Sequence, residues 1–197
     1  MDGFCGKEGV DLFALVAYLP EPLAGLVDAV RHEISPGCRL RAHVTVLPPR
    51  EFGCAPAAVS REIQRVLGQT RSFQVSVGGI KVFPGSEVIH LEIGAGLEQI
   101  RELHTELDQG LCRAPELWPF QPHITLAQGL EPAAVGPAYE LAVRRWREYS
   151  GPRSFALDHL TFVRRTLENG KGKSEEGAAQ NPWVDLATWE LPSPVLA

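Results

Sequence analysis

The chain has 197 residues, of which 44% are hydrophobic and 22% are charged, and its formal net charge at pH 7 is −5. A chain of this length and composition can bury a sizeable apolar core, so it does not belong to the disordered class. Proteins that coat long stretches of nucleic acid rely on clustered lysine and arginine side chains. The negative net charge disfavours that class and leaves a small anionic ligand or an RNA end open.

Four cysteines, at positions 5, 38, 54 and 112, lack the C-x-x-C spacing of zinc clusters and suggest no disulfide framework. We therefore expect a protein of the reducing cytoplasm. The most apolar early run, residues 12–19, is too short to cross a bilayer and follows acidic residues. We expect neither a signal peptide nor a membrane segment.

In the first part of the chain, predicted strands and helices alternate. Residues 12–19 form a compact apolar run with the length of a buried strand. Apolar residues at helical spacing follow and predict a helix that ends before Pro36 and Gly37. A strand that contains the letters HVTV, residues 43–46, comes next, and residues 56–67 carry a helical apolar stripe.

The remainder of the chain adds further strands and two more helices. Apolar and β-branched runs bounded by turn residues predict the strands. These strands are expected at residues 73–77, 80–83, 87–93, 120–127, 154–163 and 183–191. The clearest helical pattern covers residues 97–111, and a second helix, flanked by proline, contains residues 141–149. Residues 167–182 are rich in glycine and charge and predict a flexible loop.

The order strand, helix, histidine occurs twice, in residues 12–70 and in residues 85–150. The two histidines, His43 and His123, are 80 residues apart. This internal repeat predicts a duplicated α+β unit. Two related halves that face one another would bring both histidine-bearing strands to a shared cleft.

The spacing within each motif assigns the side chains to two faces. In a strand, residues i and i+2 point the same way, so His43 and Thr45 share one face while the valines beside them face the core. The same alternation places His123 with Thr125. If both polar faces line one cleft, the site contains two imidazoles and two hydroxyls.

This set of groups suits a phosphodiester. One imidazole can take a proton from the attacking water or hydroxyl, and the other can give a proton to the leaving oxygen. The hydroxyls can donate hydrogen bonds to the non-bridging oxygens, and no metal is required. Because an imidazole titrates near pH ~6.5, one neutral and one protonated copy are expected near neutrality, with a bell-shaped rate profile.

Each motif also has a purely structural interpretation. Either histidine alone could be a satisfied core residue, and threonine is common in strands because of its branched shape. The recurrence of the motif in a duplicated unit favours function. A third copy, HLTF at His159, has no strand and helix of the same spacing before it. We interpret His159 as a structural strand residue, with assistance to the site as the alternative.

The paired motifs HVTV and HITL resemble those of the two-histidine phosphoesterase superfamily. Within it, the chain is most similar to the 2'-5' RNA ligase-like, or RNA 2',3'-cyclic phosphodiesterase, family. The likeness covers about residues 12–162 and includes the setting PFQPHITLA, residues 119–127, and the turn FPG, residues 83–85. It implies an α+β, bilobal, pseudo-twofold duplicated fold, in which two antiparallel sheets flank a central cleft and the helices lie outside.

The resemblance also implies metal-free and cofactor-free catalysis on a cyclic phosphate or a 2'-5' linkage. In the usual mechanism of the family, His123 would activate water and His43 would protonate the leaving ribose oxygen, with Thr45 and Thr125 at the phosphate. Two positions depart from the family pattern. Many members have arginine where this chain has Gln128, and many have aromatic and glycine residues where it continues LPPR.

Several other side chains are candidates with two interpretations each. Arginines that flank the motifs could neutralise phosphate or could be solvated surface residues: Arg41, Arg50 and Arg113. Of these, we assign Arg41 and Arg50 to the phosphate. A basic cluster beside Trp146 could be a solvated helix face or could contact an RNA tail: Arg144, Arg145 and Arg147. Three aromatic residues could pack in the core or stack on a base: Phe83, Trp118 and Phe120.

The leading hypothesis is a single bilobal domain, residues 1–197, that acts as a metal-independent monomeric phosphoesterase. Its substrate would be a 2',3'-cyclic phosphate on an RNA end or a small nucleotide, and 2'-5' ligation would be the reverse activity. One alternative is a protein that binds a nucleotide or RNA end without turnover. Another is a metal site with both histidines and a carboxylate, although no local motif such as H-E-x-x-H supports it.

Overall fold

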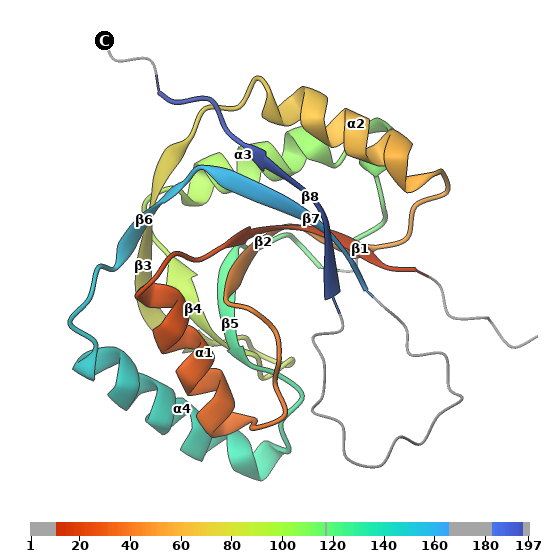
Figure 1. The fold of residues 1–197 in the computed structure, drawn as a ribbon. Coiled ribbons are helices and arrows are strands. Elements are labelled where there is room, and N and C mark those ends of the chain that lie inside the picture. The colour runs from red at the N-terminus through yellow and green to blue at the C-terminus, as the bar shows by residue number, and fades with distance from the viewer. Residues whose placement is uncertain (1–10, 117, 166–182, 195–197) are drawn as a thin grey trace, which may run out of the picture.

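The computed structural model describes residues 11–116, 118–165 and 183–194. Two four-stranded antiparallel sheets form the framework, with strand orders β2-β1-β7-β8 and β5-β4-β3-β6 (Figure 1). The strands are β1 (Phe13–Tyr18), β2 (His43–Arg50), β3 (Phe73–Val82), β4 (Ile89–Ile93), β5 (His123–Ala127), β6 (Ser154–Leu157), β7 (His159–Arg165) and β8 (Trp183–Glu190). The helices are α1 (Leu23–Ile34), α2 (Pro56–Leu67), α3 (Leu97–Leu107), the short 3-10 helix η1 (Gly110–Cys112) and α4 (Pro132–Glu148).

The sheet topology confirms the bilobal, duplicated α+β fold. In the first sheet, β1 leads through α1 to β2, and in the second, β4 leads through α3 to β5. Strands β2 and β5 occupy the same edge position in their sheets, and each begins at a histidine of the paired motif. These two edge strands contact one another, so the sheets meet where the motifs lie.

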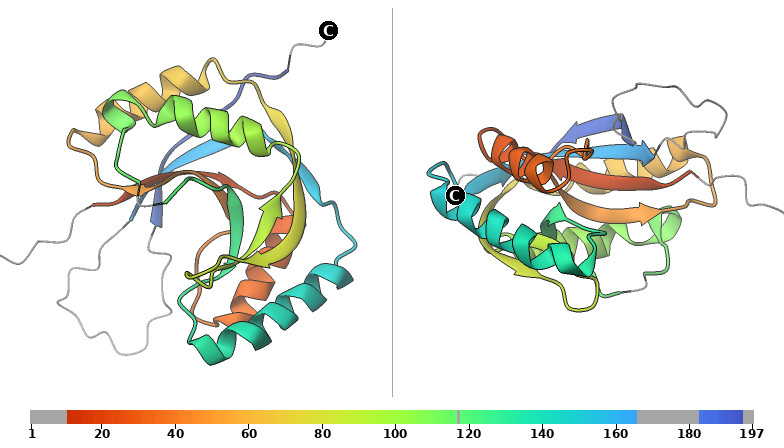
Figure 2. Two further views of the ribbon diagram at one scale, coloured as in Figure 1. Left: turned by 180° about the vertical axis from the view of Figure 1, so that it is seen from behind. Right: turned by 90° about the horizontal axis from the view of Figure 1, so that it is seen from below.

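The first helix of each repeat packs on the other half of the molecule. Helix α1 contacts β5 and α4, while α3 contacts β2 and α2. Figures 1 and 2 accordingly show α1 beside α4 on one side and α2 beside α3 on the other. Each repeat therefore packs one helix against the other repeat. Side chains on α1 can reach β5, and side chains on α3 can reach β2.

The period of two along the motif strands divides their residues between core and cleft. Val44 and Ile124 are fully buried, whereas the histidines and threonines beside them are half-buried. One continuous apolar core joins both sheets and all four α-helices. A smaller cluster, made of Ala14, Val16 and Val163, lies on the opposite face of the first sheet.

Several element boundaries differ from those expected. Residues 73–77 and 80–83 belong to one strand, β3, with a register shift between Val77 and Ile80. The segment 154–163 divides at Asp158 into β6 and β7, which belong to different sheets. The two pieces differ in burial, because alternate residues of β6 are buried whereas four consecutive residues of β7, Leu160 to Val163, are buried.

The helices also differ in extent. Helix α3 ends at Leu107, before the predicted end at residue 111, and α4 already begins at Pro132. Proline is well tolerated in the first turn of a helix, where its missing N–H leaves no bond unmade. The loop predicted at residues 167–182 lies outside the described residues.

We predict that Ile124→Ala lowers the free energy of unfolding by about 2–5 kcal/mol, because it removes a fully buried side chain beside the second motif. Urea denaturation followed by circular dichroism measures this change. Val184→Ala is the matched control, since Val184 lies on β8 and is 43% exposed, and should cost less than ~0.5 kcal/mol. Equal costs for the two variants would contradict the assignment of Ile124 to the core.

Candidate active site

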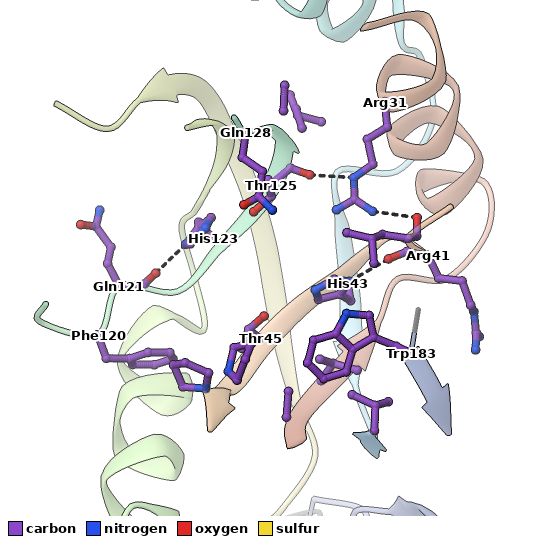
Figure 3. A pocket seen from close by; sticks show the side chains of 18 of the residues that line it. Arg31, Arg41, His43, Thr45, Phe120, Gln121, His123, Thr125, Gln128 and Trp183 are labelled. Atoms are coloured by element: carbon purple, nitrogen blue, oxygen red, sulfur yellow. Dashed lines mark hydrogen bonds between the residues drawn. The ribbon is translucent and has the colours of Figure 1, made fainter. Parts of the chain in front are cut away.

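Both histidines line one cavity of about 750 Å³ between the two lobes. His43 opens β2 and His123 opens β5, and the threonines two positions further, Thr45 and Thr125, line the same cavity. The alternation predicted from the sequence therefore presents all four side chains to one space, as Figure 3 shows. The structure brings together the two motifs that the repeat predicted to meet.

A backbone contact fixes the orientation of each imidazole. The Nδ1 atom of His43 lies 2.7 Å from the carbonyl oxygen of Arg41, and that of His123 lies 2.7 Å from the carbonyl oxygen of Gln121. Because a carbonyl oxygen only accepts hydrogen bonds, Nδ1 must donate in both rings. The neutral rings therefore carry their proton on Nδ1, and their lone pair is on Nε2.

The remaining polar atoms of these four side chains have no hydrogen-bond partner within the described parts of the chain. No described residue forms a hydrogen bond with Nε2 of His43 or His123, or with Oγ1 of Thr45 or Thr125. Two proton-accepting nitrogens and two hydroxyl donors are thus available to a ligand. The arrangement is nearly symmetric, since each motif contributes one of each.

Burial favours the neutral form of both imidazoles. It lowers the pKa of His43 to about 4, and the positive charges of Arg31 and Arg41 and the neighbouring His123 add to this effect. Burial also lowers the pKa of His123, with a further contribution from His90. The expectation of one protonated copy near neutrality is therefore wrong for the free protein, because burial penalises the imidazolium form of both rings.

Arg31 is a site residue that the sequence analysis missed. It lies on α1, is only 4% exposed and lines the cavity. Its Nε donates to the carbonyl oxygen of Thr125 at 2.8 Å, and its Nη1 donates to that of Leu40 at 3.2 Å (Figure 3). Arg31 falls four residues after Val27 on the apolar stripe of the helix. A charged residue on a buried helical stripe was the signal available.

His104 on α3 is the counterpart of Arg31 in the other half. Its Nδ1 lies 2.8 Å from the carbonyl oxygen of Val46 in β2, and its ring stacks on Phe120 at 3.8 Å. His104 also follows Ile100 by four residues on a buried stripe. Both exchanged helices therefore hold the main chain of the opposite motif strand.

The rings of His90 and Phe83 both contact the ring of His123. The ring of His90 on β4 lies 5.3 Å from that of His123 and stacks on Phe83 at 3.8 Å. The ring of Phe83 itself meets that of His123 edge-on at 4.9 Å. Phe83 therefore packs against the site histidine, and His90 is a further residue that sequence reasoning missed.

The two arginines predicted at the phosphate make different contacts. Arg41 lines the cavity, but its guanidinium stacks on Tyr18 at 3.5 Å and pairs with Asp185 at 3.0 Å. In Figure 3 its side chain extends away from His43. Tyr18 donates to the same carboxylate at 2.6 Å. The Arg41 charge is therefore already compensated at the margin of the cavity.

Arg50 is buried within a network of protein acceptors. It donates to the carboxylates of Asp108 and Glu116 and to the carbonyl oxygens of Pro48 and Cys112. Arg50 lines the cavity, but four of its donor contacts are made within the protein. These contacts tie the end of β2 to the segment after α3 through two carboxylates that sequence spacing did not reveal.

The remaining candidates lie at the margin of the cavity or outside it. Trp118, 81% exposed, and Phe120 line the cavity, as does Gln128. The residues outside the cavity lining are Arg113, Arg144, Arg145, Arg147 and His159. His159 is exposed at the start of β7 beside Asp158, which agrees with its interpretation as a strand residue.

The described residues contain neither a cluster of metal ligands nor a membrane-spanning helix. No group of three or more His, Cys, Asp or Glu side chains in the described ranges is arranged to hold a metal ion. A carboxylate to complete a metal site with His43 and His123 is therefore not found among those residues. No helix in the same part of the chain is long and apolar enough to cross a membrane.

The chain is similar to known proteins over most of its length. Residues 19–169 match the model of the 2'-5' RNA ligase superfamily. The fold is similar to that of Escherichia coli LigT complexed with 3'-AMP, with a TM-score of 0.60, 17% identity, and coverage of 94% of this chain and 100% of the other. It is also similar to that of TT0787 of Thermus thermophilus, with a TM-score of 0.56, 19% identity, and coverage of 92% and 98%.

A curated relative has a more limited likeness. The protein named "Putative phosphoesterase OB1230", from Oceanobacillus iheyensis, is 31% identical over 71 residues, which are 36% of this chain. The match spans 41% of the length of that relative, so it covers less than half of that protein.

We predict that His43 in the free protein titrates near pH 4, and that His123 titrates below the ordinary imidazole value of about 6.5. The physical reason is that burial disfavours the imidazolium form of both rings. Two-dimensional NMR of the imidazole carbon and nitrogen signals measures both midpoints and shows which ring nitrogen keeps its proton. A His43 midpoint at or above the ordinary value would contradict the predicted electrostatics.

Proposed function

Because the chain belongs to the 2'-5' RNA ligase superfamily, one of the two-histidine phosphoesterase groups, we propose that its cleft hydrolyses a 2',3'-cyclic phosphate. The substrate is the end of an RNA or a small nucleotide, and the product is a phosphomonoester. The reaction uses general acid–base catalysis by His43 and His123 and requires no metal. We propose that the protein works as a cytoplasmic monomer.

One observation carries this proposal. Two imidazoles from different lobes line a single cavity, each with Nδ1 bound to a carbonyl oxygen and with Nε2 left for a ligand. General acid–base catalysis needs one group to accept a proton and a second to donate one within reach of the same phosphorus centre. The hydroxyls of Thr45 and Thr125 supply donors for the non-bridging oxygens, where negative charge must be held.

The proposed step is the opening of the cyclic phosphate by water. A water oxygen attacks phosphorus while one imidazole Nε2 takes a proton from that water. The bond between phosphorus and one ribose oxygen breaks, and the second imidazole gives its Nε2 proton to that oxygen. The ring opens to a ribose phosphomonoester with a free neighbouring hydroxyl. If the 5' hydroxyl of another ribose attacks the cyclic phosphate in place of water, the bond between phosphorus and the 3' oxygen breaks, that oxygen takes the proton, and a 2'-5' linkage forms.

The roles of the two histidines follow from which one holds the proton. The resemblance implies that His123 is the base and His43 the acid. In the free protein, the positive charges near His43 favour its neutral form, which is the form of a base. A bound phosphate anion stabilises an imidazolium beside it, so the acid must gain its proton when substrate binds. The contacts of the bound substrate therefore decide between the two assignments.

The ligands of similar folds support the proposed substrate class. Escherichia coli LigT was crystallised with 3'-AMP and, separately, with phosphate, and these structures have TM-scores of 0.60 and 0.57 with this chain. A cavity of about 750 Å³ has the volume of a small-molecule site. We propose that a nucleotide with its phosphate between the two imidazoles occupies this cavity.

We predict that His43→Ala and His123→Ala each lower kcat/KM for a 2',3'-cyclic nucleotide about 10²- to 10⁴-fold, the usual contribution of a general acid or base. The assay measures product release in excess EDTA, so that metal-dependent hydrolysis does not contribute. His159→Ala is the matched control because it removes the histidine of the third motif outside the cavity, and it should change the rate by less than about twofold.

The outcomes separate the proposed functions. Wild-type rates in both cavity variants would overturn the assignment of the two histidines. Tight nucleotide binding by the wild-type protein without product after long incubation would instead favour the binding protein that the sequence left as an alternative.

We also predict that the pH optimum of kcat lies above that of kcat/KM. The profile of kcat/KM reports the free protein, where burial lowers the pKa of both imidazoles, so its maximum should fall on the acid side of about pH 6.5. The profile of kcat reports the complex, in which the phosphate anion raises both values. Steady-state rates between pH 4 and 9 measure both profiles, and an optimum of kcat at or below that of kcat/KM would contradict this coupling.

A further inference from the structure

Arg31 carries a positive charge into the wall of the cleft. The side chain is 4% exposed, and its two hydrogen bonds go to uncharged carbonyl oxygens, those of Thr125 and Leu40. Its Nη2 atom has no acceptor among the residues that the structure describes. A guanidinium has five N–H donors, so part of this one remains available to the cavity it lines.

The charge of Arg31 is only weakly compensated within the protein. The nearest carboxylate, that of Asp28, lies 3.6 Å from Nη1 and is 46% exposed. In contrast, the buried Arg50 contacts two carboxylates, one of them at 2.8 Å. Burying a charge is costly unless a partner of opposite charge and hydrogen bonds compensate for it. The position of Arg31 therefore suits a site that receives an anion from outside.

The surroundings of Arg31 are those of an anion site. Among the described residues, one acidic side chain lines the cavity, that of Glu116, and its carboxylate already contacts Arg50 and His104. The charge of Arg31 also acts on His43, because it contributes to the lowered pKa of that imidazole. In Figure 3 the guanidinium points toward the space between Thr125 and His43. Cation, imidazoles and hydroxyl donors thus face one volume.

We propose that Arg31 is the fixed cation of the site and binds a non-bridging oxygen of the substrate phosphate through its free N–H donors. This inference rests on the proposed function, because it takes the phosphate to lie between the two imidazoles. Arg31 is preferred over the two arginines expected from the sequence. The guanidinium of Arg41 is paired with Asp185, and that of Arg50 is held by Asp108 and Glu116.

Arg31 also has a structural role, because it connects the two repeats. Its Nε bond to the carbonyl oxygen of Thr125 connects α1 of the first repeat with β5 of the second. A purely structural tether would stabilise this arrangement without affecting the anion. Phosphate affinity and the titration of His43 separate the two roles, because each depends on the charge of Arg31 in the folded protein.

The test uses inorganic phosphate, so it does not depend on turnover. Arg31→Met should weaken phosphate binding roughly 10- to 100-fold, measured by calorimetry or NMR titration, since it removes a charged hydrogen-bond donor. The pKa of His43 should rise in the same variant because a nearby positive charge is lost. Arg31→Lys keeps the charge and should retain most of the affinity.

Arg145→Met is the matched control. Arg145 on α4 pairs at the surface with Glu33 of α1, so this variant also removes an arginine contact to α1 but lies outside the cavity. Its phosphate affinity and its His43 titration should equal those of the wild type. A loss of affinity in this control as large as that in Arg31→Met would show that the effect comes from the packing of α1 and would overturn the inference.

A measurement on the wild-type chain covers the case in which Arg31→Met does not fold. The NMR signal of the Arg31 Nε–H group should move on phosphate titration with the same midpoint as the imidazole signals, while that of Arg145 stays in place. An Arg31 signal that does not respond would overturn the inference.

The outcomes also distinguish this inference from the proposed function. If the protein binds phosphate through Arg31 but does not open cyclic phosphates, the anion site stands and the proposed reaction fails. If it opens cyclic phosphates and Arg31→Met keeps wild-type phosphate affinity, the reaction stands and the inference about Arg31 fails.

Discussion

The structure depends on the contact between two edge strands that each have a polar and an apolar face. Strands β2 and β5 lie at equivalent edges of the two sheets and contact one another. Each places alternate residues in the shared core, and these residues, such as Val44 and Ile124, are fully buried. Because side chains alternate strictly along a strand, the residues between these buried ones must face the cleft. Core packing of the valines and isoleucine thereby positions the imidazoles and hydroxyls of the cleft.

The exchange of helices between the repeats strengthens this contact at the level of the main chain. Arg31 on α1 donates to a carbonyl oxygen of β5, and His104 on α3 lies within hydrogen-bond distance of a carbonyl oxygen of β2. The two contacts occupy similar places, but their chemistry differs. Arg31 adds a permanent positive charge to the cavity, whereas His104 is stacked on Phe120 near the Arg50 and Glu116 pair. The duplicated fold thus contains a cleft whose two sides have different electrostatics.

The sequence predicted the features that follow from short-range pattern. The period of two in HVTV and HITL assigned the side chains to core and cleft, and the repeat predicted that the two motifs would meet. It could not predict which arginines are free, because the partners of Arg41 and Arg50 come from segments more than fifty residues away in the chain. The depressed pKa values of the histidines depend on burial between the lobes, which no local spacing records. The sequence shows Arg31 and His104 as polar residues on apolar helical stripes. Their hydrogen-bond partners could not be predicted, because they depend on each helix packing against the other repeat.

The backbone bonds to Nδ1 have a consequence for the direction of the chemistry. Each carbonyl keeps one proton on its imidazole, so proton exchange with a ligand is confined to Nε2 on both rings. In the proposed reaction, the two rings then share a single transferable proton. In one turnover of the proposed reaction, the imidazole that starts protonated on Nε2 loses that proton, and the imidazole that starts neutral gains one. That final state is the starting state for the opposite reaction, in which the freed ribose hydroxyl attacks phosphorus and water leaves, so the same cleft would be equipped to open a cyclic phosphate and to close one.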